Sequence, residues 1–255
     1  MADVPTPSDS DASITLHWLN KSRSQRILWL LEELGVPYEI KSYHRDSKML
    51  APPELKAVHA LGKAPVITVK DRTVAESALI VEYLCDHFGP QLIPPKWRDG
   101  CEGQVGGETE AFMRYRYYMH YCEGSLMSTM MLALIPTAIK SAPTPFFLRP
   151  ITSRIAAQLH AAFVAPGFAT HFSFLEGQLA SAPDGGPYLC GANLTGADIL
   201  MSFPLIVAQQ PIAEGALNKD AYPRLWAYTE LLKESKGYKK AVERIVELEG
   251  EYIVL

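Results

Sequence analysis

The chain has 255 residues, of which 48% are hydrophobic and 20% charged. This composition is typical of a globular protein and excludes disordered, collagen-like and coiled-coil chains. Lys and Arg number 24 and Asp and Glu 28, so the net charge is −4, and no segment gathers basic residues. We therefore expect no binding to nucleic acid.

The cysteines and the apolar segments indicate the compartment. Four cysteines are spread along the chain without a C-x-x-C pair, and the N-terminus lacks the pattern of a signal peptide. We therefore expect a reducing, cytoplasmic setting. The most apolar stretch, 126–139, is shorter than the roughly 20 residues of a membrane-spanning helix and contains Pro136. It predicts core or pocket rather than a membrane span.

The first part of the chain alternates between strand and helix patterns. Residues 1–13 have little to bury and are expected to form a disordered tail. Ile14, Leu16 and Trp18 alternate as in a strand, and from Ser22 a helical period runs to Gly35. A second extended segment, 38–43, follows. A strand, helix and strand in this order predict parallel pairing through a right-handed crossover.

The next segments complete a small α/β domain. A short helix is expected over 53–59, a strand over 66–69 with an antiparallel partner near 73–75, and a helix over 76–88. The order β-α-β-α-β-β-α is sufficient for a complete α/β domain, 14–93. Residues 94–107 hold two prolines and four glycines and predict a linker.

Beyond the linker, only helical patterns occur, so 108–255 is expected to be an all-helical domain. The expected helices cover 108–131, 150–164, 171–179, 198–209 and 223–246. Segment 136–150, with four prolines and the pair Phe146-Phe147, reads as an irregular insertion. It would either cover a pocket or meet a membrane surface, and nothing else in the sequence supports membrane association.

The loop 20–26 precedes the N-terminus of the first helix. Backbone N–H groups and the positive end of the helix favour an anion there. A thiolate held in this place would have a lowered pKa, and Ser22 is the hydroxyl that we expect to donate a hydrogen bond to it. Ser22 followed by Gln25 also fits a capping box, which needs no ligand, and spacing alone favours the cap.

A second group of candidate residues surrounds the turn Leu61-Gly62-Lys63-Ala64-Pro65-Val66. A proline at a strand entrance can be cis, which would turn the backbone N–H and C=O of Ala64 outward to pair with an extended peptide. Glu76 can bind an ammonium group, Ser77 a carboxylate, and Lys63 a second carboxylate. Those are the groups of glutathione. Taken alone, Pro65 reads as a turn residue and Glu76 as a surface acid.

Four segments together resemble a cytosolic glutathione transferase. They are Ser22-Arg23-Ser24-Gln25-Arg26, Leu61-Gly62-Lys63-Ala64-Pro65-Val66, Ala75-Glu76-Ser77 and Leu194-Thr195-Gly196-Ala197-Asp198-Ile199. The fungal GTT-type enzymes also have similar residues at His17-Trp18-Leu19, Ala51-Pro52-Pro53-Glu54-Leu55, Glu123-Gly124-Ser125-Leu126 and Gly196 to Leu205. The likeness spans about residues 14–245.

The resemblance implies an α/β thioredoxin-like N-terminal domain with the glutathione site and an all-α C-terminal domain with the acceptor site, usually in a homodimer. It implies that Lys63, Ala64, Glu76 and Ser77 bind glutathione, with Pro65 cis. Ala64 stands where a valine is usual, and His59-Ala60 replaces a frequent Asn-Pro.

The catalytic position in the first loop is open to several residues. Classes of the family place a Tyr, Ser, Cys or Asn there, and alignment admits any of Asn20, Lys21, Ser22, Arg23 and Ser24. Ser22 is the expected catalytic residue. The loop has no cysteine, which argues against mixed-disulfide chemistry because that mechanism needs a protein thiol.

Two further segments belong to the helical domain. Between Phe112 and Met131, residues at helical spacing predict core. The resemblance implies that this helix begins the acceptor pocket, which one or two of Tyr115, Tyr118 and Tyr121 would line. Thr195 and Asp198 fit another capping box, and we expect Asp198 to serve folding rather than chemistry.

The sequence thus predicts an enzyme that activates glutathione, as a co-substrate, for attack on a small hydrophobic electrophile. The same thiolate would also serve a double-bond isomerase or a peroxidase. A protein of another class, a non-catalytic glutathione-binding regulator or carrier, would keep the same fold. Seven histidines show no ligand spacing, so no metal is expected.

Overall fold

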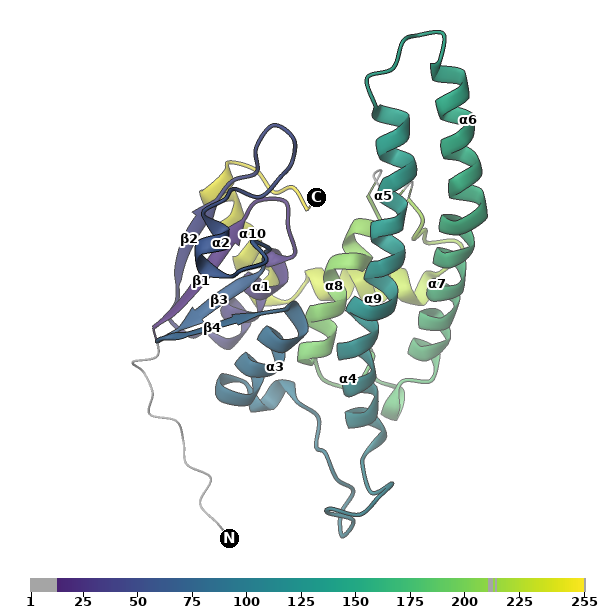
Figure 1. Ribbon diagram of the computed structural model, residues 1–255. Helices are drawn as coiled ribbons and strands as arrows, with labels where there is room; N and C mark the ends of the chain where they lie inside the picture. The colour runs from purple at the N-terminus through teal and green to yellow at the C-terminus, as the bar shows by residue number, and fades with distance from the viewer. Residues whose placement is uncertain (1–12, 211–212, 214, 255) are drawn as a thin grey trace. The chain divides into compact units, whose positions relative to one another are not determined.

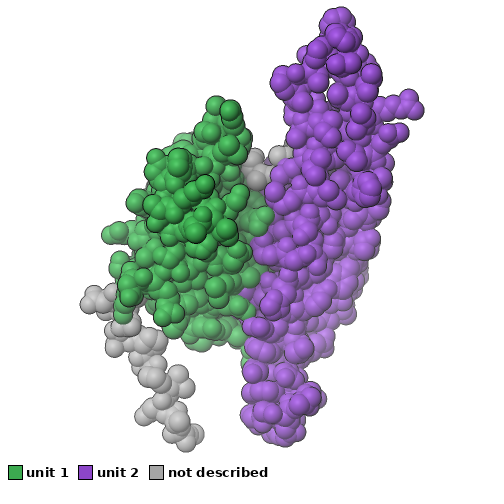
Figure 2. Space-filling view, viewed as in Figure 1, with its two compact units in different colours: residues 1–95, 194–203, 232–255 green, residues 96–193, 204–231 purple. Residues whose placement is uncertain are grey.

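A computed structural model describes residues 13–210, 213 and 215–254. The expected tail, 1–13, lies outside these ranges apart from Ser13. The chain divides into two compact units (Figure 2). Unit 1 comprises 1–95, 194–203 and 232–255, and unit 2 comprises 96–193 and 204–231. The expected division at the linker followed the order of the chain, whereas packing groups two later segments with unit 1.

Unit 1 contains a four-stranded sheet in the order β2-β1-β3-β4 (Figure 1). Its strands are β1 (Ile14–Leu19), β2 (Glu39–Tyr43), β3 (Val66–Val69) and β4 (Arg72–Ala75). β1 pairs with β2 in parallel and with β3 antiparallel, and β3 pairs with β4 antiparallel. The parallel first pair and the antiparallel last pair confirm the sequence-based expectation. Leu16 and Trp18, on one face of β1, are fully buried.

Helices α1 (Ser24–Leu34), α2 (Leu55–Val58), α3 (Ser77–Phe88) and α10 (Lys236–Glu249) complete unit 1. α1 ends at Gly35 in the left-handed conformation, as the sequence predicts. α10 packs along α1 (Figure 1). Trp29 meets Tyr238 edge to face with ring centroids 5.3 Å apart, and a Cβ at Gly237 would lie 2.8 Å from the Glu33 Cα. The absence of a side chain at Gly237 thus allows the close approach of the two helices.

Unit 2 is helical. It contains α4 (Glu110–Tyr121), η2 (Cys122–Leu126), α5 (Met127–Ser141), α6 (Arg149–Leu159), η3 (His160–Val164), α7 (Ala165–Ala180) and most of α9 (Pro223–Lys233). α8 (Gly196–Ala208) passes from unit 1 into unit 2 after Phe203. The expected linker is an ordered loop, because Lys96 O accepts from Thr109 N–H at 2.9 Å and Gly107 O from Arg98 N–H at 2.9 Å.

Several helix boundaries differ from the sequence-based expectation, among them the start of α7 at Ala165 rather than at residue 171. The expected helix 223–246 is two helices, because the Ser235 side chain accepts from Tyr238 N–H and begins α10. Segment 136–150 was expected to be irregular, yet α5 continues through Pro136 to Ser141. After Ser141 the backbone becomes extended at Ala142, the residue before Pro143, because a following proline disfavours the helical conformation.

α4, η2 and α5 form one continuous helix, Glu110–Ser141, of 32 residues. Within the described part of the chain, it is the helix that has the length and apolar composition to cross a membrane. Core helices of soluble proteins meet the same criterion. Tyr118, Met119 and Leu126 are buried within unit 2, whereas Met131, Leu132 and Ile135 farther along the helix are exposed.

Candidate functional site

Ser22 lies in the loop between β1 and α1 and is 4% exposed. Its hydroxyl donates to Leu19 O at 2.7 Å, lies 3.0 Å from Ser24 Oγ and accepts from Ser24 N–H at 3.1 Å. These bonds form a local turn that delivers the chain into the helix. The hydroxyl hydrogen therefore has a protein acceptor, which an incoming thiolate would have to replace.

The expected capping box between Ser22 and Gln25 is absent, which corrects that prediction. α1 begins at Ser24, and no side chain caps it at Arg23. Gln25 points to the C-terminal segment instead, where its Nε2 donates to Ile253 O at 3.0 Å and to Val254 O at 2.8 Å. Residue spacing predicted the capping box because local spacing carries no information about an acceptor 228 residues farther along the chain.

Arg45, which follows β2, holds the first loop in place. Its backbone N–H donates to Asn20 Oδ1 at 2.9 Å, and its guanidinium donates to Asn20 O at 3.3 Å and to Met49 O at 2.9 Å. A longer contact of 3.4 Å reaches Lys21 O. Burial lowers the pKa of Arg45. Sequence reasoning missed this role, because a lone arginine in a loop is most simply interpreted as a solvated surface charge.

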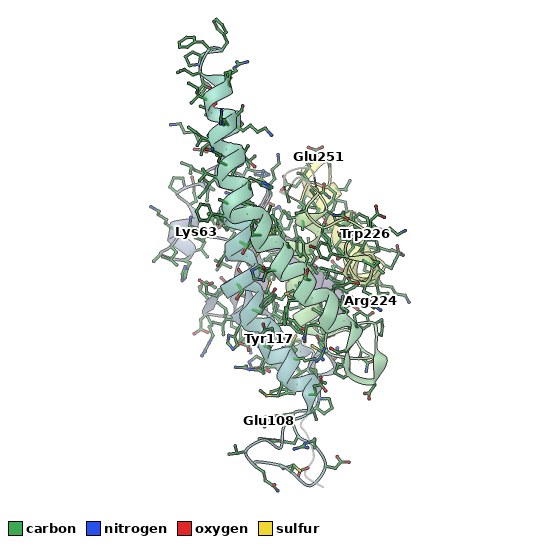
Figure 3. All side chains as sticks on the ribbon, turned by 90° about the vertical axis from the view of Figure 1, so that its right-hand side faces the viewer. Lys63, Glu108, Tyr117, Arg224, Trp226 and Glu251 are labelled. Carbon is green, nitrogen blue, oxygen red and sulfur yellow. The ribbon has the colours of Figure 1, made fainter. Side chains whose placement is uncertain are left out.

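The turn before β3 has the geometry that the resemblance implied, because the Ala64–Pro65 peptide is cis. Gly62 has a φ of 58° and its N–H donates to His59 O at 2.8 Å, which closes the turn. Pro65 is buried, Ala64 is half-buried and Lys63 is exposed on the loop between α2 and β3 (Figure 3). Ala64 and Lys63 thus lie just before the start of β3, at one end of the sheet.

The register of β3 and β4 brings the second candidate group together. Val66 pairs with Ala75, so Pro65 and Glu76 continue these strands at the same end of the sheet. Glu76 is exposed and has a φ of 72° and a ψ of 119°, a sparsely populated conformation for a residue with a side chain. Such outliers gather at binding sites, where the surrounding structure imposes them.

Ser77 begins α3 and is 3% exposed. No side chain caps this end of α3. The backbone N–H groups of the first turn of α3 and the positive end of the helix dipole therefore favour an anion at this N-terminus. Lys63, Ala64, Pro65, Glu76 and Ser77 all belong to unit 1 and surround the same end of the β3–β4 pair.

Arg26 is a residue of this site to which sequence reasoning gave no role. Although charged, it is 1% exposed. Its Nη2 donates to Ser77 Oγ at 2.9 Å and its Nη1 donates to Leu200 O at 2.8 Å, and its guanidinium carbon lies 5.7 Å from the centroid of the Phe203 ring. A fixed positive charge thus lies directly behind the first residue of α3. The sequence offers no signal for this role, because Arg26 lies among the polar residues of the first turn of α1.

The tyrosines expected to line an acceptor pocket are buried in unit 2. Tyr115, Tyr118 and Tyr121 are 3%, 0% and 7% exposed. Tyr118 Oη donates to Gln178 Oε1 at 3.3 Å, and Tyr121 Oη lies 2.7 Å from His171 Nδ1. Burial raises the pKa of Tyr121 and lowers that of His171, so both side chains are neutral at pH 7. Their role in a pocket stays a prediction.

Tyr117 is an exposed ring of the same aromatic cluster (Figure 3). It stacks on Tyr121 with ring centroids 5.4 Å apart and also contacts the rings of Tyr118 and Phe174. Tyr117 lies four residues before Tyr121, and this spacing could have indicated that the two rings share one face of the helix. Sequence reasoning did not assign Tyr117 to the pocket.

The second capping box has the structural role expected for it. The Asp198 carboxylate accepts from Thr195 N–H at 2.8 Å and from the Thr195 hydroxyl at 2.6 Å. Asp198 is fully buried and Thr195 is 4% exposed. The carboxylate is therefore committed to the start of α8.

Comparison with known proteins assigns both parts of the chain to one family. Residues 22–87 match the family model for the glutathione S-transferase N-terminal domain, and residues 152–243 match that for the C-terminal domain. A similar curated protein is glutathione S-transferase 1 of Saccharomyces cerevisiae, which is 32% identical over 237 residues, covering 91% of this chain and 94% of the relative.

Solved structures agree with this assignment. A glutathione S-transferase from Actinobacillus pleuropneumoniae is 33% identical with a TM-score of 0.63, covering 91% of this chain and 92% of the other. A glutathione transferase from Phanerochaete chrysosporium, in complex with oxidised glutathione, shares the fold at 19% identity and a TM-score of 0.66, covering 93% of this chain and 98% of the other. The chain therefore belongs to the glutathione S-transferase family.

Proposed function

We propose that this protein is a glutathione transferase that binds glutathione on unit 1, keeps its thiol ionised and presents the thiolate to a small hydrophobic electrophile. The observation that carries the proposal is the register of β3 and β4, which brings the cis-Pro65 turn beside Glu76 and Ser77. The names of the relatives and the glutathione-bound relative support the activity.

Each charged group of glutathione has a matching partner in this proposal. The Ala64 backbone pairs with the cysteinyl main chain, as an added strand does at a sheet edge. Glu76 binds the ammonium group, and the start of α3, with Ser77 and the charge of Arg26 behind it, binds the neighbouring carboxylate. Lys63 binds the carboxylate at the other end of the tripeptide.

The thiolate lies at the N-terminus of α1 in this proposal, with Ser22 as its hydrogen-bond donor. For this, the Ser22 hydroxyl turns from Leu19 O to the sulfur, and Arg45 keeps the loop backbone in place meanwhile. A cysteine thiol has a pKa near 8.5, and each unit of lowering corresponds to about 1.4 kcal/mol of preference for the thiolate. A lowering of one or two units would ionise much of the bound thiol at pH 7.

The test is a calorimetric titration with glutathione, followed by ultraviolet absorbance of the bound thiolate across pH. We expect saturable binding and a thiolate signal that persists well below pH 8. Ser22→Ala should raise the thiol pKa and lower turnover with 1-chloro-2,4-dinitrobenzene, in which the sulfur attacks the ring and chloride leaves. Ser42→Ala, an exposed serine on β2, is the matched control. Asn20→Ala tests the neighbouring candidate in the loop.

The hydrogen bond from Ser22 to Leu19 O favours one alternative, a glutathione-binding regulator or carrier without catalysis. Binding with a thiol pKa that stays at its free value would support that reading, and absence of binding would contradict both. A peroxidase or double-bond isomerase would share the thiolate. Turnover that leaves glutathione unconsumed would identify the isomerase.

For the acceptor, we propose the aromatic cluster of α4, with Tyr117 as the contacting ring and Tyr115, Tyr118 and Tyr121 supporting it. Tyr117→Ala should raise the KM for a hydrophobic electrophile while leaving the Kd for glutathione unchanged. Exposed Met113 on the same helix provides the control, Met113→Ala. The homodimer implied by the resemblance is a proposal that light scattering can test.

A further inference from the structure

The segment from Gly124 to Leu175 contains no aspartate or glutamate. All 28 acidic residues lie elsewhere, and the whole chain has a net charge of −4. The Lys and Arg residues of this segment are Lys140, Arg149 and Arg154, so it carries three positive charges. The segment's charge is therefore opposite in sign to that of the whole molecule. The hairpin formed by α5 and α6 lies within this segment.

The far half of this hairpin has no core of its own. α5 and α6 pack against each other, yet no residue between Pro136 and Ala156 is buried. At the end of the hairpin, in the loop 142–148, Phe146 is 80% and Phe147 64% exposed. Ile151 and Ile155 on α6 are also exposed. We call this surface, residues 140–155, the hairpin tip (Figure 1).

The hairpin tip is ordered by its own hydrogen bonds. Leu148 N–H donates to Pro145 O at 2.9 Å, and Thr152 N–H donates to Leu148 O at 3.1 Å. The rings of Phe146 and Phe147 meet edge to face with centroids 5.7 Å apart. Internal bonding matters because backbone groups that enter an apolar phase must already be satisfied. The two rings thus project from a preformed loop whose polar groups are partly paired.

We propose that the hairpin tip docks on the surface of a bilayer containing anionic lipid. Phe146 and Phe147 enter the boundary between headgroups and acyl chains, where aromatic rings are favoured. Lys140 and Arg149, on either side of the loop, contact the lipid phosphates and carboxylates. The same charges disfavour a second copy of this tip as the occupant, because two copies would bring like charges together.

The experiment is co-sedimentation of the purified full chain with vesicles of phosphatidylcholine alone or of phosphatidylcholine mixed with phosphatidylserine. We expect binding to the mixed vesicles, at least tenfold weaker binding to neutral ones, and release at high salt. Phe146→Ser with Phe147→Ser should weaken binding at least tenfold. Val105→Ser, which changes another exposed apolar residue, should leave binding unchanged.

A charge variant separates the contribution of the basic residues from that of the two phenylalanine rings. Lys140→Gln with Arg149→Gln should remove the preference for phosphatidylserine, whereas Lys219→Gln with Arg72→Gln, in exposed positions elsewhere, should keep it. Circular dichroism and turnover of a water-soluble electrophile should stay unchanged in all of these variants, which shows that they fold.

Three outcomes would overturn the proposal. They are absence of binding to mixed vesicles, equal binding to both kinds of vesicle, and unchanged binding by the phenylalanine variant. If that variant instead lowered the mass of the free protein in light scattering and left vesicle binding intact, the tip would be an interface between copies. None of these readouts depends on glutathione binding, so they stand apart from the proposed activity.

Discussion

The N-termini of α3 and α8 have opposite arrangements. At α8, the buried Asp198 carboxylate accepts two hydrogen bonds from Thr195, so the helix end is closed by its own side chain. At α3, Glu76 provides no side-chain cap, and buried Arg26 contacts Ser77 from behind. A helix end that caps itself serves folding, whereas an uncapped end with a cation behind it remains open to an anionic ligand.

The largest effect that we expect comes from opening the closed end. Asp198→Ala removes two charge-assisted hydrogen bonds at a fully buried position, which should lower the free energy of unfolding by about 3 kcal/mol. Urea unfolding measures this loss. The Kd for glutathione of the folded protein should stay as in the wild type. A large change in Kd without loss of stability would place Asp198 in the binding site.

Removing the cation behind the open end should affect binding. Arg26→Met leaves Ser77 Oγ and Leu200 O without this donor and removes the positive charge, so we expect the Kd for glutathione to rise about tenfold, or 1.4 kcal/mol. The Kd of Arg26→Lys should lie between those of the wild type and Arg26→Met. Arg114→Met is the matched control, because Arg114 donates to Gln178 O and Ser181 O in unit 2. If both variants weakened binding equally, the effect would reflect stability alone.

The open end can also be closed by design. Leu79 is the third residue of α3, as Asp198 is of α8, and it is 52% exposed. Leu79→Asp should place a carboxylate where the ligand carboxylate is expected and weaken glutathione binding about threefold, or roughly 0.7 kcal/mol. Calorimetry at low and high salt should show a smaller effect at high salt. Leu79→Asn keeps the shape without the charge and should bind nearly as the wild type does.

The smallest effect that we expect is that of acid on the free energy of unfolding. Neither helix end contains a histidine, so this effect should come from elsewhere in unit 1. His17 on β1 contacts Tyr43 and Thr68, and burial, together with Lys41, lowers its pKa below 6.5. The unfolded chain therefore takes up the proton first, so the free energy of unfolding should fall as pH drops from 6.5 through the folded-state pKa. His17→Gln should reduce this fall in urea titrations, and an unchanged slope would contradict the assignment.

Local patterns were sufficient for much of unit 1. The alternation at Ile14, Leu16 and Trp18, the helix end at Gly35 and the parallel β1–β2 pair all followed from the sequence, because periodicity and crossover geometry are local or topological rules. The resemblance supplied the cis peptide before Pro65 and the candidate glutathione contacts. Those contacts stay predictions until a ligand is bound.

What the sequence did not indicate depends on contacts between distant segments. Arg26 meets Leu200 O across 174 residues, and Gln25 meets the C-terminal segment across 228. Both side chains looked like ordinary polar residues of a first helical turn, and the capping box was wrong for Gln25 for this reason. The break at Ser235 was missed because apolar residues keep a helical spacing on both sides of it.

The bonds from Gln25 to Ile253 and Val254 also bear on synthesis of the chain. A ribosome adds about 5–20 residues per second, so the partners of Gln25 are made on the order of ten seconds or more after it. During that interval, the nascent first unit lacks α10 and the carbonyls that anchor the start of α1. Full assembly of the start of α1 therefore waits until this late segment has left the exit tunnel.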